Sequence, residues 1–183
     1  LSYRADLTTG LQATHREEGL TEGFDDGGIR GGRQGGKEAF ARSLALSGRL
    51  DWSPMPGFLF GASFFTGNSG TNTEAGEGPR ITTTVMDLHG ELRLRGWQVR
   101  ALWARFTNSA TGVDQLDPTD PARHVGTKAG GAYLEAGYDV LNGRSGKQAL
   151  IPFLRLERVD TQKSVMAGVD ADPANDQKIT TVG

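Results

Sequence analysis

Ionisable residues occupy every second position in the middle of this sequence. Asp87, His89, Glu91 and Arg93 alternate with apolar residues or glycine. Carboxylates and a histidine could transfer protons, but alternate residues of an extended chain all point to one side, and this row mixes both signs of charge. Such a row is typical of a wall in contact with water. There the charges either pair across strands or set the selectivity for ions.

The residues between these charges predict the element that positions them, a β-hairpin. A period of two indicates a strand, whereas on a helix the charges would surround the whole circumference. The apolar set of the first strand is Met86, Leu88, Gly90, Leu92 and Leu94. Arg95-Gly96 forms the turn, and the return strand places Trp97, Val99, Ala101 and Trp103 on the apolar face. The hairpin within Thr84–Arg105 therefore has one apolar face and one charged face.

The same pattern recurs along the chain and predicts an all-β protein. The further strands are expected at Leu1–Thr14, Ala41–Trp52, Phe58–Thr66, Gly131–Leu141 and Gln148–Val159, with the start of another at Lys178–Gly183. This makes seven strands and the start of an eighth, and no segment of helical periodicity interrupts them. Pro152 is expected to mark an edge or a bulge, because proline cannot donate to a strand ladder.

Long and short connections alternate along this series. The turns at Ser53–Gly57, Arg95-Gly96 and Asn142-Gly143 are short, whereas the other connections are long, polar and glycine-rich. Antiparallel strands joined in this way place all long loops at one end, as in outer-membrane barrels. Aromatic residues are expected to form two girdles. One contains Trp52, Phe58 and Trp97 at the short-turn end, and the other contains Phe40, Phe64, Phe106 and Tyr133 at the long-loop end.

Composition excludes several other classes of protein. The formal charge is −2, so nothing favours nucleic acid as a partner. The chain has no cysteine, and His15, His89 and His124 have no metal-ligand spacing, so no metal, cofactor or enzyme activity is expected. Gly31–Lys37 fits G-x-x-x-x-G-K, but Glu38 stands where a phosphate-binding loop needs Ser or Thr. Asp170, Asp172, Asn175 and Asp176 are better explained by turn formation than by calcium binding.

The two faces of the strands permit two orientations. If the apolar face meets lipid, the charged face lines a pore; a soluble ligand-binding barrel would instead turn the leucines inward. Loop asymmetry and aromatic placement favour the lipid orientation. The expected pore-lining residues are then Arg49, Asp51, Asp87, His89, Glu91, Arg93, Arg100, Glu135, Asp139, Arg155 and Glu157. Because four arginines face six carboxylates, anion selectivity would require Arg30, Arg33 and Lys37 to fold inward from the first long loop.

Three blocks of the sequence also resemble a known family. They are Gly28–Gly36, Gly90–Arg105 and Tyr133–Gln162, and Ala171–Gly183 is similar to the segment that follows. Together they resemble bacterial outer-membrane porins of the phosphate-selective porin O/P type. The resemblance implies a barrel of about sixteen strands, preference for anions such as phosphate, and a homotrimer.

The sequence therefore predicts residues 1–183 to be a single-domain fragment of an antiparallel up-and-down transmembrane β-barrel, lacking both natural termini. The expected function is passive diffusion of small hydrophilic or anionic solutes across a bacterial outer membrane, with membrane lipid as a partner. Two alternatives remain. One is an outer-membrane anchor or adhesin without a conducting pore, and the other is a soluble ligand-binding barrel.

Overall fold

The computed structural model describes residues 1–13, 23–24, 29–34, 39–70, 78–115, 126–144 and 148–183. These residues form one antiparallel sheet with almost no helix. Its strands are β1 (Ser2–Thr9), β2 (Leu44–Trp52), β3 (Phe58–Asn68), β4 (Thr82–Leu94), β5 (Trp97–Asn108), β6 (Lys128–Tyr138), β7 (Phe153–Ser164) and β8 (Asp176–Val182). The all-β prediction is confirmed in this form.

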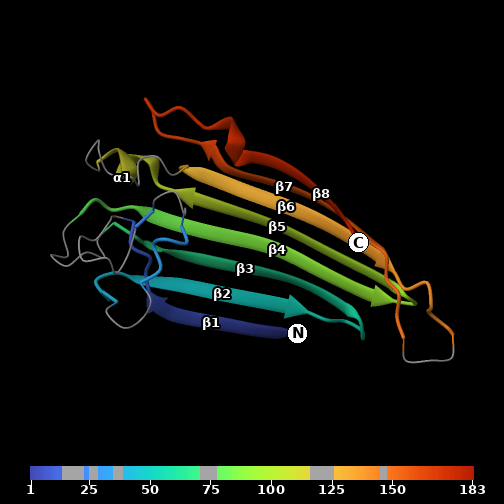
Figure 1. The fold of residues 1–183 in the computed structure, drawn as a ribbon. Helices are drawn as coiled ribbons and strands as arrows, with labels where there is room; N and C mark the ends of the chain where they lie inside the picture. The colour runs from blue at the N-terminus through green and yellow to red at the C-terminus, as the bar shows by residue number, and fades with distance from the viewer. Residues whose placement is uncertain (14–22, 25–28, 35–38, 71–77, 116–125, 145–147) are drawn as a thin grey trace.

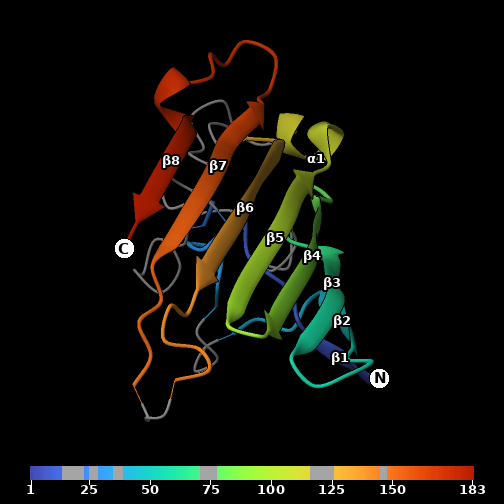
Figure 2. The same ribbon diagram turned by 90° about the vertical axis from the view of Figure 1, so that its right-hand side faces the viewer.

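Each strand pairs with the strand next to it in the sequence, in the order β1 to β8 (Figure 1). The sheet curves strongly and stays open, so that β1 and β8 form its two edges (Figure 2). Neither β1 nor β8 has a second partner strand among the described residues, and an edge strand of this kind offers backbone donors and acceptors for further pairing. No helix among the described residues is long and apolar enough to cross a membrane.

The central hairpin forms where the alternation predicts it. Arg95 and Gly96 both have positive φ, at 51° and 88°. Two such residues define a type I′ turn, whose twist matches that of the flanking strands. The register Leu94↔Trp97, Leu92↔Val99 and Leu88↔Trp103 then places the apolar residues of β4 and β5 on the same face.

Several predicted boundaries were wrong. β1 ends at Thr9 rather than Thr14, and β6 ends at Tyr138. β7 begins only at Phe153, so Pro152 lies outside the strand. The connection from β6 to β7 is consequently longer than the short turn expected at Asn142-Gly143. Helix α1 (Ala110–Asp114) and the 3₁₀ helix η2 (Pro173–Asn175) also interrupt the series, where no helical segment was expected.

The outer face of the sheet is apolar and exposed. Leu88 is 45% exposed and Leu156 is 51% exposed, although both lie in the middle of strands. The large apolar residues that share this face and this exposure include Leu7, Leu46, Leu50, Phe60, Phe64, Met86, Trp103, Leu134 and Leu154. The leucines of the alternating pattern therefore do not meet in a dry centre.

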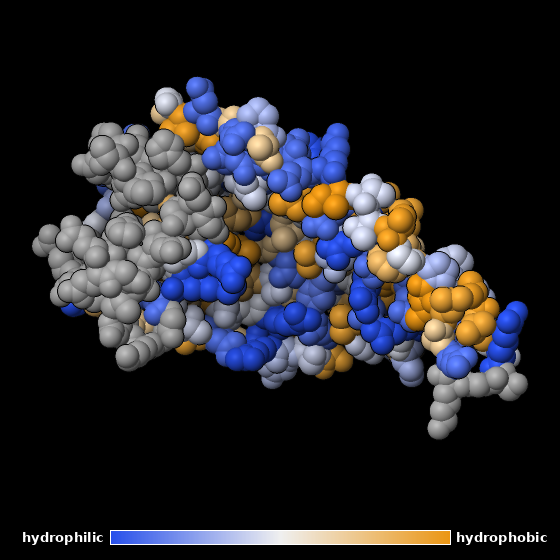
Figure 3. Space-filling model, viewed as in Figure 1, coloured by the Kyte–Doolittle hydropathy of each residue, from blue (hydrophilic) through white to orange (hydrophobic). Residues whose placement is uncertain are grey.

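The inner face is concave and carries the charged residues. Figure 3 shows this face hollowed, with hydrophilic side chains spread across the sheet. It is the side on which Asp87, His89 and Glu91 alternate with the outward Met86 and Leu88.

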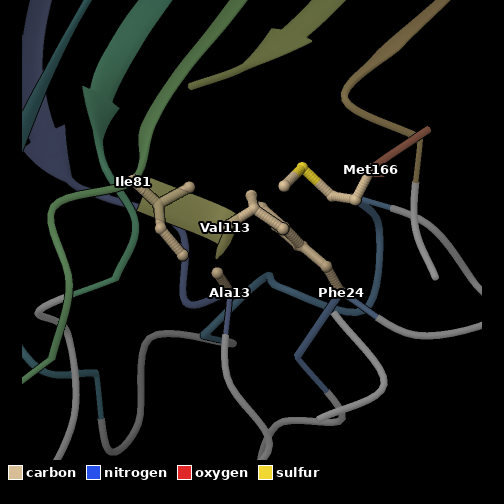
Figure 4. Close-up of a cluster of buried hydrophobic side chains, with 5 residues drawn as sticks. All are labelled: Ala13, Phe24, Ile81, Val113 and Met166. Carbon is tan, nitrogen blue, oxygen red and sulfur yellow. The ribbon is translucent and has the colours of Figure 1, made fainter. Parts of the chain in front are cut away.

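The long-loop end holds the buried apolar core. Its members come from the four long connections and the strand ends beside them. The side chains that pack together are those of Ala13, Phe24, Ile81, Val113 and Met166 (Figure 4). The ring of Phe24 also contacts Phe106 of β5 edge-on, with 6.3 Å between ring centroids. Burial of these side chains ties the loops to one another and to the inner face of the sheet.

Candidate functional site

A ladder of alternating charge crosses the inner face from β4 to β7. Cross-strand register aligns Glu91 with Arg100, Arg100 with Glu135, and Glu135 with Arg155. The guanidinium of Arg100 lies 3.9 Å from the Glu91 carboxylate and 3.6 Å from that of Glu135. Arg155 then lies 3.9 Å from Glu135 and 2.7 Å from Glu157. From Glu91 to Arg155, each charge therefore meets the opposite sign on a neighbouring strand, and Glu157 pairs with Arg155 along β7.

The ladder extends at both ends. Arg93 pairs with Glu91 on the same strand, two residues away. At the other end, the guanidinium carbon of Arg155 lies 3.9 Å above the ring centroid of Tyr133. Stacking of this kind fixes the plane of an arginine and leaves its edge free to bond carboxylates.

A second cluster lies on β2, β3 and β4. The two ring nitrogens of His89 lie 3.0 Å from an oxygen of Asp51 and 2.7 Å from an oxygen of Asp87. Arg49 pairs with Asp51 at 2.7 Å, and the Ser63 hydroxyl donates to Asp87. The structure thus brings together four of the predicted pore-lining residues.

Gly61 makes this second cluster possible. It lies in β3 between Asp51 of β2 and His89 of β4, its partners on the two sides. A Cβ atom at Gly61 would collide with Asp51 Oδ1 and His89 Nε2. Without a side chain there, Asp51 and His89 reach each other over the backbone of the strand between them.

The structure adds two details to the predicted set of inner-face residues. Asp139 lies one residue beyond β6, and its carboxylate accepts hydrogen bonds from the backbone N–H groups of Leu141 and Leu150. It holds the connection to β7 rather than a position within a strand. The ion pair of Arg4 with Asp6, at 2.7 Å, was missed. The alternation of these two residues with Tyr3, Ala5 and Leu7 could have revealed it.

Two members of the predicted long-loop girdle face inward, so that prediction was wrong in part. Phe106 is buried against Phe24 on the inner side, and Tyr133 lies beneath Arg155. At the short-turn end, aromatic pairs do form. Trp52 packs edge-on against Phe58, with 6.1 Å between ring centroids, and Trp97 packs against Tyr138 at 5.1 Å.

The basic residues of the first long loop are only partly described. Arg30 and Arg33 are exposed, and the backbone N–H of Arg33 donates to the carbonyl of Arg30 at 3.3 Å. Lys37 lies outside the described residues, as do parts of the Gly31–Lys37 motif. Inward folding of these three cations stays a prediction.

The acidic residues before β8 serve the local backbone. Asp172 caps η2 by accepting from the Ala174 N–H at 2.9 Å, and Asp176 pairs with Arg158. Within the described ranges, no group of three or more potential ligands is placed to hold a metal ion. These contacts are turn chemistry of the kind that the sequence predicted there.

The inner face can therefore hold water and pair charges, and its charge balance is nearly even. Opposite charges that pair across strands keep a polar surface hydrated without a strong field of either sign. Such a wall suits contact with hydrophilic solutes of either charge.

Comparisons with known proteins identify no family. No family model matches the chain, and no solved structure matches it. The chain is similar to an uncharacterized protein of Aquifex aeolicus (strain VF5), with 29% identity over 189 residues. The alignment covers 100% of this chain and 42% of that protein, so the chain spans less than half the length of this relative.

Proposed function

We propose that this chain is part of an outer-membrane β-barrel porin that lets small hydrophilic solutes diffuse passively across the membrane. The observation that carries the proposal is the exposure of the apolar outer face over the whole sheet, opposite a concave face of paired charges. Proteins in water seldom expose apolar patches larger than a few hundred Å². Lipid hydrocarbon would cover this face.

Strand length and open edges support the same proposal. β3 to β7 contain 11 to 13 residues each, enough for a tilted strand to cross the hydrocarbon core, which needs about 9–11. In hydrocarbon, each backbone polar group needs a partner, so a spanning sheet must close. The free edges of β1 and β8 would pair with further strands of a longer chain, in line with the partial coverage of the Aquifex aeolicus relative.

Solute preference follows from the paired wall together with the first long loop. The charge ladder alone favours neither anions nor cations. Anion selectivity, including selectivity for phosphate, would come from Arg30, Arg33 and Lys37 if they reach the pore. Reversal potentials across a salt gradient test this, because neutralising these three residues should abolish the preference for anions. An unchanged reversal potential would contradict the role of the loop.

Conductance of the full-length protein in a planar bilayer tests the porin proposal itself. Discrete ohmic steps are expected. The apolar cluster of the long loops favours a second candidate, a barrel that anchors loops for a partner and has no open path. Insertion into the bilayer without conductance would support that anchor. A protein that stays in the aqueous phase without detergent would contradict both candidates and support a soluble barrel.

A further inference from the structure

A hollow of about 750 Å³ lies on the outer face at the long-loop ends of β5, β6 and β7. Four basic residues line it, and we call it the basic hollow. These residues are Arg105, Lys128, Arg158 and Lys163. Asp160 is the acidic residue in its lining. No pattern in the sequence marks this group, because its members come from three strands.

Strand register builds the basic hollow from two rows. One row is Arg105, Gly130 and Asp160, and the next is Trp103, Ala132 and Arg158. In both rows the residue of the middle strand is small. The floor is therefore low at Gly130 and Ala132, with long side chains rising on either side.

A register shift supplies the fourth cation. β6 and β7 pair as Gly130↔Asp160 but as Lys128↔Ser164, so extra residues of β7 bulge out between these pairs. Exposure in β7 follows even numbers up to Arg158 and odd numbers at Thr161 and Lys163. A bulge redirects side chains in this way. Without the shift, Lys163 would face the inner side.

The charges of the basic hollow are unlike those of the inner face. Arg158 is held by Asp176, with both of its bonding nitrogens 3.0 Å from carboxylate oxygens. Arg105, Lys128 and Lys163 form no ion pair within the part of the chain that the structure describes. Three cations thus share one concave surface without an ion-pair partner among the described residues, which favours an anionic ligand.

The position of the basic hollow indicates which kind of anion it would bind. One row further along the strands, toward the short turns, Ala101, Leu134 and Leu156 continue the exposed apolar face. A ligand with both a phosphate and acyl chains fits this sequence of surfaces, with the phosphate among the cations and the chains along the leucines. A solute inside the pore would meet the opposite face of the sheet.

We propose that the basic hollow binds the phosphate-bearing headgroup of a membrane lipid. This inference rests on the proposed function, because it needs the outer face to meet a bilayer. Lys and Arg near an anionic lipid surface each strengthen attachment, and guanidinium matches phosphate with two parallel hydrogen bonds. The bound lipid would fix the long-loop end of β5 to β7 at the headgroup level.

The test uses the full-length protein reconstituted into phosphatidylcholine nanodiscs that contain either a phosphorylated glycolipid or the same lipid with its phosphates removed. Native mass spectrometry counts the bound glycolipid. The double variant Arg105→Gln/Lys128→Gln should bind the phosphorylated lipid roughly twenty-fivefold more weakly, at about fivefold per cation. Binding of the dephosphorylated lipid should be weak for both proteins.

The matched control is Arg95→Asn/Arg144→Gln, which removes two exposed cations at the opposite ends of the strands. It should bind the phosphorylated lipid like the unchanged protein. Equal binding of both lipids by an inserted protein would overturn the lipid site but leave the porin proposal intact, as would full competition by inorganic phosphate. Failure of the unchanged protein to enter phosphatidylcholine bilayers would contradict the proposed function as well.

Discussion

The two faces of this sheet treat charge in opposite ways. On the inner face, arginines and carboxylates of adjacent strands meet, so that Glu135 serves both Arg100 and Arg155. On the outer face, apolar side chains fill the strands, and three cations of the basic hollow lie together at the long-loop end, with no ion pair to any residue that the structure describes. One alternating sequence can therefore encode two different environments, one on each face. Paired charge is typical of a hydrated surface. Unpaired charge beside an apolar band is typical of a surface that another molecule covers.

The largest expected difference in the free energy of unfolding comes from making the same substitution on the two faces. Leu88→Arg puts a charge on the outer face, where it should lower the free energy of unfolding in a bilayer by about 2–4 kcal/mol. Leu102 of β5 is the matched control, because it is a leucine on the inner face, paired with His89. Leu102→Arg should cost less than half as much, because its charge stays near water and carboxylates. Urea unfolding of the full-length protein in vesicles measures both, and equal losses would contradict the assignment of faces.

Removing the shared carboxylate of the ladder should have a smaller effect. Glu135→Gln leaves Arg100 and Arg155 facing each other with no negative charge between them. Each such partly exposed pair contributes about 0.2–1 kcal/mol, so a loss of about 1 kcal/mol is expected. If the wall lines a pore, the reversal potential in a salt gradient should also shift toward anions.

Asp6→Asn is the control for the ladder, because Asp6 pairs with one arginine near the edge of the sheet. It should change stability by less than Glu135→Gln. A shift in reversal potential as large as that of Glu135→Gln would show that position in the ladder does not matter.

Filling the space at Gly61 should lower stability by about as much as Glu135→Gln does. Gly61→Ala pushes the ends of Asp51 and His89 apart, and losing one such hydrogen bond costs about 0.5–1.5 kcal/mol. Gly48→Ala is the outer-face counterpart, since the three atoms nearest to its Cβ would all belong to the ring of Phe64. If the outer face meets lipid, that ring can turn outward, so we expect a smaller loss, measured by the same urea unfolding. A larger loss for Gly48→Ala would mean that the outer face is packed against protein.

Local alternation predicted the sheet and most of its charged face. The hairpin of β4 and β5 follows directly from its period of two and from Arg95-Gly96, because both signals act between neighbouring residues. The pairing of Glu91 with Arg100 follows too, since the tight turn fixes the register of this hairpin. The later steps of the ladder cross longer connections, so no single turn fixes them. The same period of two, continued along β5, would also have placed Phe106 on the inner face with Ala104, and not in a girdle.

Contacts between distant segments could not be predicted in this way. Phe24 lies in the first long loop and Val113 in helix α1, and only the folded chain shows that they pack together. The outward position of Lys163 depends on a register shift against β6, which no local pattern announces. The role of Asp139 depends in the same way on Leu150, eleven residues further along the chain.

The most direct test of the proposed orientation is to measure which face of β4 meets lipid. The sequence has no cysteine, so single cysteines can be placed from Met86 to Glu91 and labelled with a nitroxide in the full-length protein. Collision rates should alternate with a period of two. Labels at Met86, Leu88 and Gly90 should meet oxygen dissolved in lipid, and labels at Asp87, His89 and Glu91 should meet a water-soluble nickel chelate. The reverse alternation, or access of the chelate to every position, would contradict the proposal that the apolar face of β4 meets lipid.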